Sequence, residues 1–283
     1  MPEVSIERTD GPFGAIVQGV DLRDAPAGAR ADRLRAAWLA HQVLVFPEQE
    51  LTFSELEAAA RAFGPIGEDP YFRPIAGQPH VVALTREADE STPLFADVWH
   101  SDWSFLPTPP AGTLLYGVDI PPVGGDTLFA DQYAAYESLP PSLRDRVEGL
   151  HGLHSAERGY SKQGLYGDRD QGRSMAIVAS DSALATHPHP LVRTHPETGR
   201  KALYVSLAYT VGIEGLASHE ANSLIGELLG FVAQPEHTYR HRWAPGTVVL
   251  WDNRCLLHAA TGGYDGHRRE LHRLTIAERR PAP

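Results

Sequence analysis

Short apolar segments, each closed by glycine, proline, asparagine or aspartate, recur along the chain and limit its possible folds more than any other feature. Four of them read "GTLLYGVDI", "KALYVSL", "TVVLWDN" and "ELHRLTIAE". Such bounded segments, rich in β-branched and aromatic residues, are typical of strands. The segment "THPETGRKALYV" (194–205) predicts a hairpin that turns at Pro196–Gly199.

Helical patterns are fewer and better delimited. Residues 27–42 have helical apolar spacing, and "VLVF" (43–46) then indicates a buried strand. Thr52 and Glu55 form a capping box for a helix that ends at Gly64–Pro65. A third helix is expected at about 217–233, beginning near Ser218. Short strands with a few helices predict a mainly β fold, an antiparallel barrel or jelly roll with helices packed outside.

Domain organisation follows from the absence of internal repeats, long linkers and low-complexity tracts. We therefore expect a single domain spanning residues 1–283. The long stretch 157–188 contains four glycines, and connections of this length are uncommon unless they cover a site or are disordered. Two interpretations of this stretch remain open, a surface loop and a lid over a substrate.

Charge and cysteine content exclude several classes of partner. With 25 basic and 36 acidic residues the formal charge is −11, which disfavours binding to nucleic acid or to anionic membranes. The N-terminus lacks a signal-peptide pattern, and no run approaches the roughly 18 apolar residues of a membrane span. The single cysteine, Cys255, rules out an intramolecular disulfide and a cysteine-rich zinc site. We expect a soluble cytoplasmic protein in which Cys255 is a small core residue.

The stretch "VWHSDWSF" (98–105) places polar groups among bulky apolar residues. In a strand, His100 and Asp102 would point to one face and could bind a metal ion together. A two-histidine, one-carboxylate iron site needs another histidine, and the best candidate is His258, which follows a strand (247–251) and a turn at Asp252–Asn253. Hydrogen-bonded or core histidines remain the alternative at this point.

Two arginines near the C-terminus alternate with leucine. Arg269, Leu271 and Arg273 would share one face of the last strand. If that face is buried, the arginines need anions, and a carboxylate clamp is favoured because guanidinium matches carboxylate geometry. A solvated edge strand is the alternative. The turn Gly124–Gly125–Asp126, followed by Thr127 at a strand start, indicates by itself only a hairpin.

Together these segments resemble the taurine dioxygenase/2,4-D dioxygenase (TauD/TfdA) family of Fe(II)- and 2-oxoglutarate-dependent oxygenases. The resemblance covers nearly the whole chain, and it implies a double-stranded β-helix (jelly-roll, cupin-like) core with flanking helices. The ordered segments that carry it are "GAIVQGVDLRD", "HQVLVFPEQELT", "WHSDWSF", "TPPAGTLL", "GGDTLFAD", "HPLVRTHPETGRKALYV", "WDNRCLLH" and "HRRELHRLTI".

The resemblance also implies roles for the residues. His100, Asp102 and His258 match the Fe(II) ligands, which leave positions for 2-oxoglutarate and O2. Arg269 and Thr127 match the partners of the far carboxylate of 2-oxoglutarate. Arg273 matches a second arginine near the iron-bound end of the cosubstrate and, in several members, near the substrate anion. The implied reaction hydroxylates an unactivated C–H bond and releases succinate and CO2.

The implied substrate is a small organic anion. Taurine is disfavoured, because Asp69 precedes Pro70 where taurine-type enzymes place a histidine, and Ala96 and Val98 stand where they place an asparagine. Apolar groups are expected to line the pocket beside Arg273, so an aryloxyalkanoate, alkyl sulfate or larger sulfonate is favoured. These groups are Tyr71, Phe72, Val98 and Trp103. The resemblance further suggests a homo-oligomer, a dimer or tetramer.

Two other functions are alternatives to this hypothesis. One is a metal-dependent cupin that does not use 2-oxoglutarate, with His187 and His189 of "THPHPL" as ligands. It would leave Arg269 and Thr127 without a role. The other is a non-catalytic sensor of metal or 2-oxoglutarate, against which the intact ligand set argues.

Overall fold

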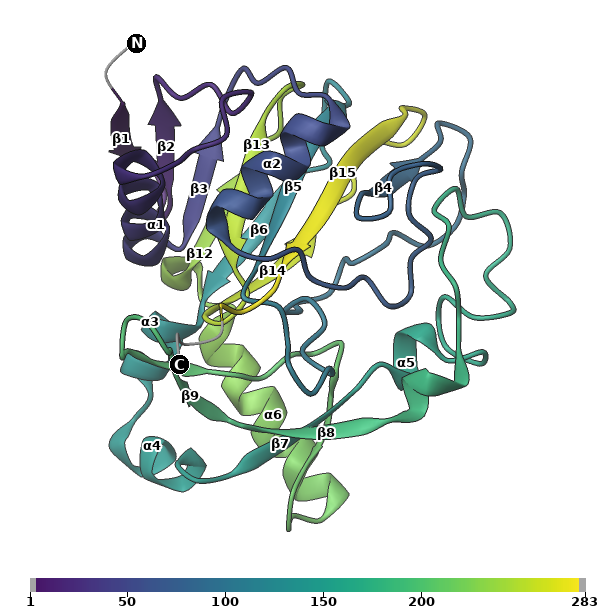
Figure 1. Cartoon of the computed structure of the whole chain (residues 1–283). Helices are drawn as coiled ribbons and strands as arrows, with labels where there is room; N and C mark the ends of the chain where they lie inside the picture. The colour runs from purple at the N-terminus through teal and green to yellow at the C-terminus, as the bar shows by residue number, and fades with distance from the viewer. Residues whose placement is uncertain (1–3, 280–283) are drawn as a thin grey trace.

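A large, mostly antiparallel sheet forms one side of the molecule in the computed structural model, which describes residues 4–279 (Figure 1). All neighbouring strands in it are antiparallel except β2 and β3, which run parallel. Its strands, in spatial order, are β1 (Ser5–Arg8), β2 (Ala15–Gln18), β3 (Val43–Phe46), β13 (Val248–Asp252), β5 (Gly112–Asp119), β15 (Arg269–Ile276) and β4 (Val82–Arg86).

Three smaller antiparallel sheets complete the β structure of the described residues. The one that matters most for the site has the order β12 (Thr238–His241), β6 (Thr127–Asp131), β14 (Leu256–Ala260). The others are β11 (Thr210–Ile213), β7 (His151–Ser155), β8 (Thr186–Pro190) and the pair β9 (Val192–Thr194), β10 (Lys201–Leu203). The fold is therefore a mixed one with several antiparallel sheets and flanking helices, which confirms the expected fold at this level.

The three main helices form where the sequence predicted them. They are α1 (Ala29–His41), α2 (Phe53–Phe63) and α6 (Ser218–Val232), and Thr52 and Glu55 make the expected capping box of α2. Shorter helices are α3 (Gln132–Ser138), α4 (Pro141–Val147), α5 (Glu157–Tyr160), η1 (Asp181–Leu184) and η2 (Pro235–His237). Within the described part of the chain, no helix has the length and apolarity needed to cross a bilayer.

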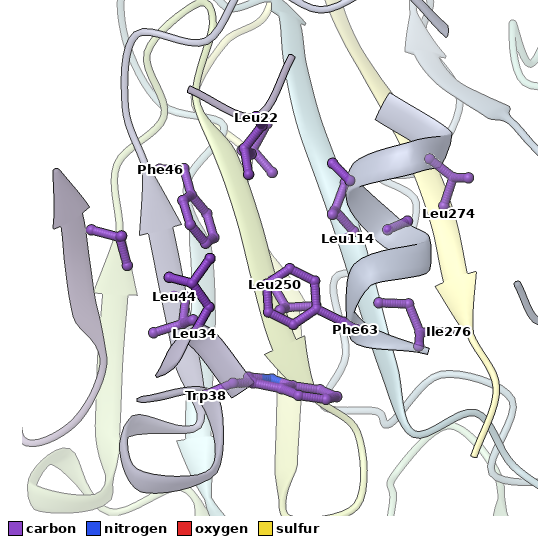
Figure 2. Packing of buried hydrophobic residues seen from close by; sticks show 14 of the residues in the cluster. Leu22, Leu34, Trp38, Leu44, Phe46, Phe63, Leu114, Leu250, Leu274 and Ile276 are labelled. Carbon is purple, nitrogen blue, oxygen red and sulfur yellow. The ribbon is translucent and has the colours of Figure 1, made fainter. Parts of the chain in front are cut away.

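Strand alternation gives the large sheet two apolar faces. One face packs under α1 and α2, where Trp38 and Phe63 cover Leu44, Leu114 and Leu250 (Figure 2). The alternate residues of the same strands face the other way and belong to a second cluster, which includes Phe129 of β6 and Leu256 of β14. The strand residues in it include Val43, Val45, Val249 and Trp251. The helices thus close one face of the large sheet, and the other face meets the small β12–β6–β14 sheet.

The expected strands form, with ends that differ by one or two residues and with one larger shortening. β9 and β10 pair with Lys201 opposite Thr194, as the hairpin prediction required. The strand expected at 201–207 ends at Leu203, however. There the Tyr204 N–H donates to the carbonyl oxygen of Leu191, and the Ser206 N–H donates to the Thr210 hydroxyl, so the chain turns away.

The stretch 157–188 is tied to the rest of the molecule. Its Ile177 makes an isolated bridge with Phe72, and the Val178 N–H donates to the carbonyl oxygen of Tyr71 at 2.8 Å. Tyr160 stacks on Tyr71 with ring centroids 4.8 Å apart. Parts of this segment are therefore packed against Tyr71 and Phe72.

Candidate active site

Two histidines are brought together by backbone pairing. His100 and His258, 158 positions apart in sequence, form an antiparallel bridge in which each N–H donates to the other's carbonyl oxygen, at 3.0 and 2.7 Å. Directly paired residues point to the same face, so the imidazole centroids lie 4.1 Å apart. Asp102 completes the group: its Oδ1 is 3.8 Å from the Nε2 atom of each histidine.

The protonation of this cluster suits a divalent metal. Burial lowers the pKa of His100 and lowers that of His258 to about 3, so both rings are neutral at pH 7. Nδ1 of His100 donates to the carbonyl oxygen of Val98 at 2.8 Å, which leaves Nε2 with a lone pair directed at the cluster. Burial alone would raise the pKa of Asp102, but the neighbouring His258 imidazole and the Arg273 guanidinium hold it below its ordinary value. Two neutral imidazoles and one carboxylate are a ligand set typical of non-haem Fe(II).

Two neighbouring side chains fix the carboxylate of Asp102. The Thr113 hydroxyl donates to Asp102 Oδ2 at 2.6 Å, and Asn253 Nδ2 in turn donates to that hydroxyl oxygen at 2.8 Å. Asn253 Oδ1 also accepts from the indole N–H of Trp251 at 2.9 Å. Oδ1 of Asp102 is thereby left to face the histidines. The "WDN" segment is thus part of the support of the ligand, as well as packing.

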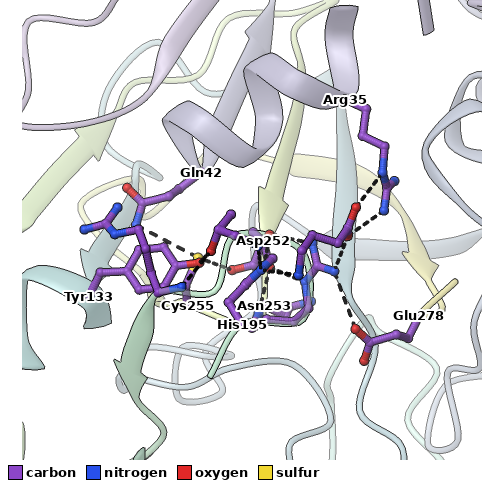
Figure 3. A network of polar contacts seen from close by, with 12 residues as sticks. Arg35, Gln42, Tyr133, His195, Asp252, Asn253, Cys255 and Glu278 are labelled. Atoms are coloured by element: carbon purple, nitrogen blue, oxygen red, sulfur yellow. Dashed lines mark hydrogen bonds and ion pairs between the residues drawn. The ribbon is translucent and has the colours of Figure 1, made fainter. Parts of the chain in front are cut away.

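A buried charge network anchors the turn that carries this support (Figure 3). Asp252 accepts from Arg254 at 2.7–2.8 Å and lies 3.1 Å from Nε2 of His195. Arg254 also pairs with Glu197, which pairs with Arg35 of α1. Burial opposes the ionised form of Asp252, but Arg254 and His195 hold the pKa of its carboxyl well below the ordinary range. The turn between β13 and β14 is therefore fixed to α1 and to the 195–197 segment.

A cavity of about 60 Å³ lies next to the three ligands. Arg269 reaches it from β15: its Nη2 donates to the carbonyl oxygen of Gly125 at 2.9 Å, while its Nε is buried without a partner. Among the described residues no carboxylate forms an ion pair with Arg269, and burial lowers the pKa of its guanidinium. Thr127 lies at the same cavity, with its hydroxyl accepting from the indole N–H of Trp243 at 3.0 Å. A buried, unpaired guanidinium beside a hydroxyl is suited to an incoming carboxylate.

Arg273 lines the same cavity but already has a carboxylate partner. Its Nη2 donates to Oδ1 of Asp69, and the two side chains are 4% and 9% exposed. The guanidinium carbon lies 4.5 Å from the ring centroid of Phe72 and 4.8 Å from that of Trp103. The expected alternation on the last strand is confirmed, because Arg269, Leu271 and Arg273 all line this cavity.

A second cavity, of about 190 Å³, also borders His100. Phe95, Ala96 and His100 line both cavities, so the 95–96 segment lies between them. The lining of the second cavity is otherwise mostly apolar and aromatic, with one arginine. These residues are Val98, Arg158, Gly159, Tyr160, Leu165, Tyr166, Leu207, Ala208 and Tyr209.

The residues predicted to line the substrate pocket separate into two groups. Val98 does line the second cavity. Tyr71, Phe72 and Trp103 instead belong to a buried aromatic cluster with Phe105 and Tyr160, and they line neither cavity. Their bulk is used to pack against one another and against Arg273, because the 71–73 segment is paired with residues 176–178.

Other predicted groups have structural roles. Cys255 is buried in the core cluster, as expected. His187 and His189 lie on β8; Nε2 of His189 is hydrogen-bonded to the carbonyl oxygen of Leu106 at 2.9 Å. Among residues 4–279, the metal-ligating cluster consists of His100, Asp102 and His258 only, so the cupin ligand set is not formed.

Sequence reasoning missed the residues that support or surround the ligands. Thr113 and Asn253 orient Asp102, and Tyr160 and Tyr209 line the second cavity. The pairing of Asp69 with Arg273 was missed as well. Thr113 is the second residue of β5 and carries no distinctive pattern. Asn253 could have been found, because it directly follows the buried strand that leads to His258.

The family model described as "Taurine catabolism dioxygenase TauD, TfdA family" matches residues 5–275. The chain belongs to this family. A (S)-phenoxypropionate/alpha-ketoglutarate-dioxygenase of Sphingobium herbicidovorans is 37% identical over 262 residues, covering 92% of this chain and 90% of its relative. An alpha-ketoglutarate-dependent 2,4-dichlorophenoxyacetate dioxygenase of Cupriavidus pinatubonensis is 36% identical over 281 residues, covering 94% and 95%.

Solved structures agree with the family assignment. The crystal structure of a taurine dioxygenase from Burkholderia xenovorans superimposes with a TM-score of 0.81 at 31% identity, covering 98% of this chain and 92% of that one. The TauD/TfdA protein described here is accordingly a 2-oxoglutarate-dependent non-haem iron dioxygenase, and His100, Asp102 and His258 are its facial triad. When bound, Fe(II) would activate O2 with electrons from 2-oxoglutarate (alpha-ketoglutarate), and the protein contributes position and selectivity.

Proposed function

We propose that this dioxygenase hydroxylates the carbon next to the ether oxygen of an aryloxyalkanoate, with 2-oxoglutarate and O2 as cosubstrates. The observation that carries the proposal is the apolar, aromatic second cavity, which reaches the metal ligand His100. Two relatives of 36–37% identity that act on phenoxyalkanoates support it. Such a cavity is suited to an aryl ring, which binds mainly by burial of apolar surface.

The cosubstrate belongs, in this proposal, in the cavity of Arg269 and Thr127. The guanidinium of Arg269 and the hydroxyl of Thr127 hold the far carboxylate of 2-oxoglutarate, which satisfies the buried Nε of Arg269. Arg273 faces the same cavity nearer the ligands and is assigned to the substrate carboxylate and the iron-bound end of the cosubstrate. The β5–β15 side of the large sheet and the β6–β14 side of the small sheet then form the two walls of a double-stranded β-helix.

The segment 157–188 is proposed as the cover of the substrate. It contributes Tyr160, Leu165 and Tyr166 to the second cavity and Met175 to the first. The Tyr166 hydroxyl accepts from the Ala96 N–H at 3.3 Å, which ties the cover to the segment between the two cavities. A closed cover excludes water while the C–H bond is positioned.

The proposed reaction balances without a further reductant. One oxygen atom of O2 enters succinate as 2-oxoglutarate loses CO2, and the other enters the C–H bond as a hydroxyl group. The product carries a hydroxyl and an aryloxy group on one carbon. It therefore breaks down by proton transfer and C–O cleavage to a phenol and a 2-oxo acid.

Succinate formation from 2-oxoglutarate, with Fe(II), ascorbate and air, tests the proposal. Phenoxyacetate and both enantiomers of 2-phenoxypropionate are compared with an alkyl sulfate, taurine and a larger sulfonate, alongside His100→Ala. We expect a phenol and stoichiometric succinate from at least one aryloxyalkanoate and none from the variant, since His100 is a metal ligand. Stimulation by the sulfate alone, or by taurine, contradicts the proposed substrate class.

A further inference from the structure

The buried pair of Arg273 and Asp69 gives the substrate end of the site an unusual charge balance. Arg273 is the residue assigned to the substrate anion, yet its Nη2 already donates to Asp69 Oδ1. Asp69 lines neither cavity, although its carboxyl lies close enough to the ligand Asp102 for the two charges to interact. The Arg273 Nε is buried and unpartnered, which leaves donor capacity on the guanidinium.

Asp69 is one of several groups that hold Arg273 in place. The guanidinium is also fixed by contact with the rings of Phe72 and Trp103, at 4.5 and 4.8 Å from their centroids. Asp69 is itself held by a second donor, the indole N–H of Trp103, at 3.2 Å. The charge of Asp69 is therefore added to a position that packing also supports.

This charge has a direct effect on an incoming anion. A guanidinium can bind a carboxylate with two parallel hydrogen bonds, through Nη1 and Nη2 or through Nε and Nη2. Because Nη2 takes part in both arrangements, a carboxylate already bound to Nη2 leaves weaker hydrogen bonding for a second carboxylate. The two carboxylates also repel each other in a site that is shielded from water, where charge interactions are stronger than in bulk solvent. Both effects weaken recognition through charge and leave recognition through the apolar body unchanged.

We infer that Asp69 limits how much charge contributes to substrate binding: it offsets the charge of Arg273, so that an anion binds well only when burial of a large apolar body adds to the binding free energy, and small hydrophilic anions bind weakly. The inference deepens the proposed function and rests on its assignment of Arg273 to the substrate anion. It also gives a physical reason for disfavouring a short aminosulfonate, whose binding energy must come almost entirely from charge and hydrogen bonds.

The isosteric variant Asp69→Asn isolates the charge. Asparagine keeps an oxygen that accepts from Arg273 and from Trp103, so the positions of these side chains are maintained. Binding is measured by calorimetry on protein loaded with Mn(II) and 2-oxoglutarate under nitrogen, with phenoxyacetate, taurine and neutral phenoxyacetamide as probes. We expect D69N to bind both anions more tightly by about tenfold, the effect of removing one nearby charge, and the amide unchanged.

Asp97→Asn is the matched control. Asp97 is an exposed carboxylate on the 95–98 segment beside the second cavity, so this variant makes the same change of net charge without touching Arg273. An equal gain in D97N would assign the effect to overall charge and overturn the inference. Weaker binding of all three probes by D69N would make Asp69 a positioning residue instead, and an unchanged affinity for the anions would also refute the inference.

The double variant D69N/R273Q covers the case of poor folding and tests the mechanism. If Asp69 acts through Arg273, the gain from D69N is smaller in the Arg273→Gln background, where only the direct repulsion between the two carboxylates is relieved. If D69N does not fold, the comparison of R273Q with D69N/R273Q still tests the inference: a gain of the full size, about tenfold, without Arg273 refutes it. Failure of the proposed function has a different signature, because wild-type enzyme then produces no phenol from any aryloxyalkanoate, whatever the binding results show.

Discussion

Arg269 and its sequence neighbour Arg268 show that burial gives two side chains of the same type different partners. Arg269 is buried, with one donated bond to Gly125 and an unpartnered Nε. Arg268 lies on the surface and pairs with Glu87, Asp119 and Glu270. Exposed pairs of this kind contribute little, roughly 0–1 kcal/mol. A buried guanidinium that gains a carboxylate partner contributes far more to binding. Substitution of Arg269 is therefore expected to affect 2-oxoglutarate binding much more than substitution of Arg268.

At the residue scale, Arg269→Gln is expected to weaken 2-oxoglutarate binding strongly. Losing one partner of a buried charge pair costs about 2–5 kcal/mol, which corresponds to a KM for 2-oxoglutarate raised by about 100-fold. The matched control, Arg268→Gln, is expected to change this KM by less than about threefold. Succinate formation at varied 2-oxoglutarate measures both. A similar KM in the two variants would remove Arg269 from the cosubstrate site.

At the element scale, the turn before β6 depends on a close backbone approach. Gly124 has φ +66°, and a Cβ there would lie 2.6 Å from the carbonyl oxygens of Gly262 and Gly263, in the connection between β14 and β15. Gly125, at φ +69°, has the Arg269 Nε 3.0 Å from its Cβ position. Because these glycines let the two connections touch, they set the distance between Thr127 and Arg269, the two proposed cosubstrate groups.

Gly124→Ala is expected to destabilise the fold more than the backbone conformation alone explains. The control is Gly199→Ala: Gly199 has φ +70°, but no atom lies within 4 Å of its Cβ position. In both variants an alanine must adopt a left-handed backbone conformation. Only Gly124→Ala also pushes the two connections apart, which lowers the free energy of unfolding by about a further 1–3 kcal/mol. Urea unfolding of the two variants measures the difference. Equal losses would show that the contact between the connections relaxes freely.

At the scale of the whole molecule, buried histidines make stability depend on pH. Burial, reinforced by His189 and Arg193, lowers the pKa of His154 to about 3. Burial likewise lowers the pKa of His241 to about 4. In the unfolded chain the histidine pKa values are near 6.5. Between about pH 3 and pH 6.5 the unfolded chain therefore binds more protons than the folded protein. The stability gained by burying these histidines in their neutral form is therefore fully present above about pH 6.5, and it is lost as the pH falls toward 3–4.

His154→Gln is expected to flatten this dependence. For one such histidine the free energy of unfolding falls by about 2–3 kcal/mol between pH 6 and pH 4, and the variant lacks that part of the slope. Urea unfolding of metal-free protein at several pH values gives the slope, with the exposed His219→Gln as control. The baseline stability of H154Q will be lower, because the contact of Nδ1 with the Ser104 hydroxyl at 2.9 Å is changed. If stability depends on pH as steeply in His154→Gln as in the wild type, His154 is not one of the groups that cause this dependence.

Local pattern determined much of what was predicted correctly. The capping box of Thr52 and Glu55, the alternation of Arg269, Leu271 and Arg273, and the hairpin around 194–205 each depend on neighbours in sequence. The ligands His100, Asp102 and His258 were also found, through ordered motifs rather than geometry. These features are readable because backbone periodicity and capping act over a few residues.

Tertiary structure alone decided which groups meet. The bridge between His100 and His258, the support of Asp102 by Thr113 and Asn253, and the pairing of Arg273 with Asp69 join residues far apart in the chain. Tyr71, Phe72 and Trp103, expected along the substrate pocket, pack in an aromatic cluster instead, because the 157–188 segment lies against residues 71–73. Burial and partner choice depend on packing across the whole fold. The sequence by itself therefore determined the elements and the reaction class, while the packing of the folded chain decided how the charge of Arg273 is balanced.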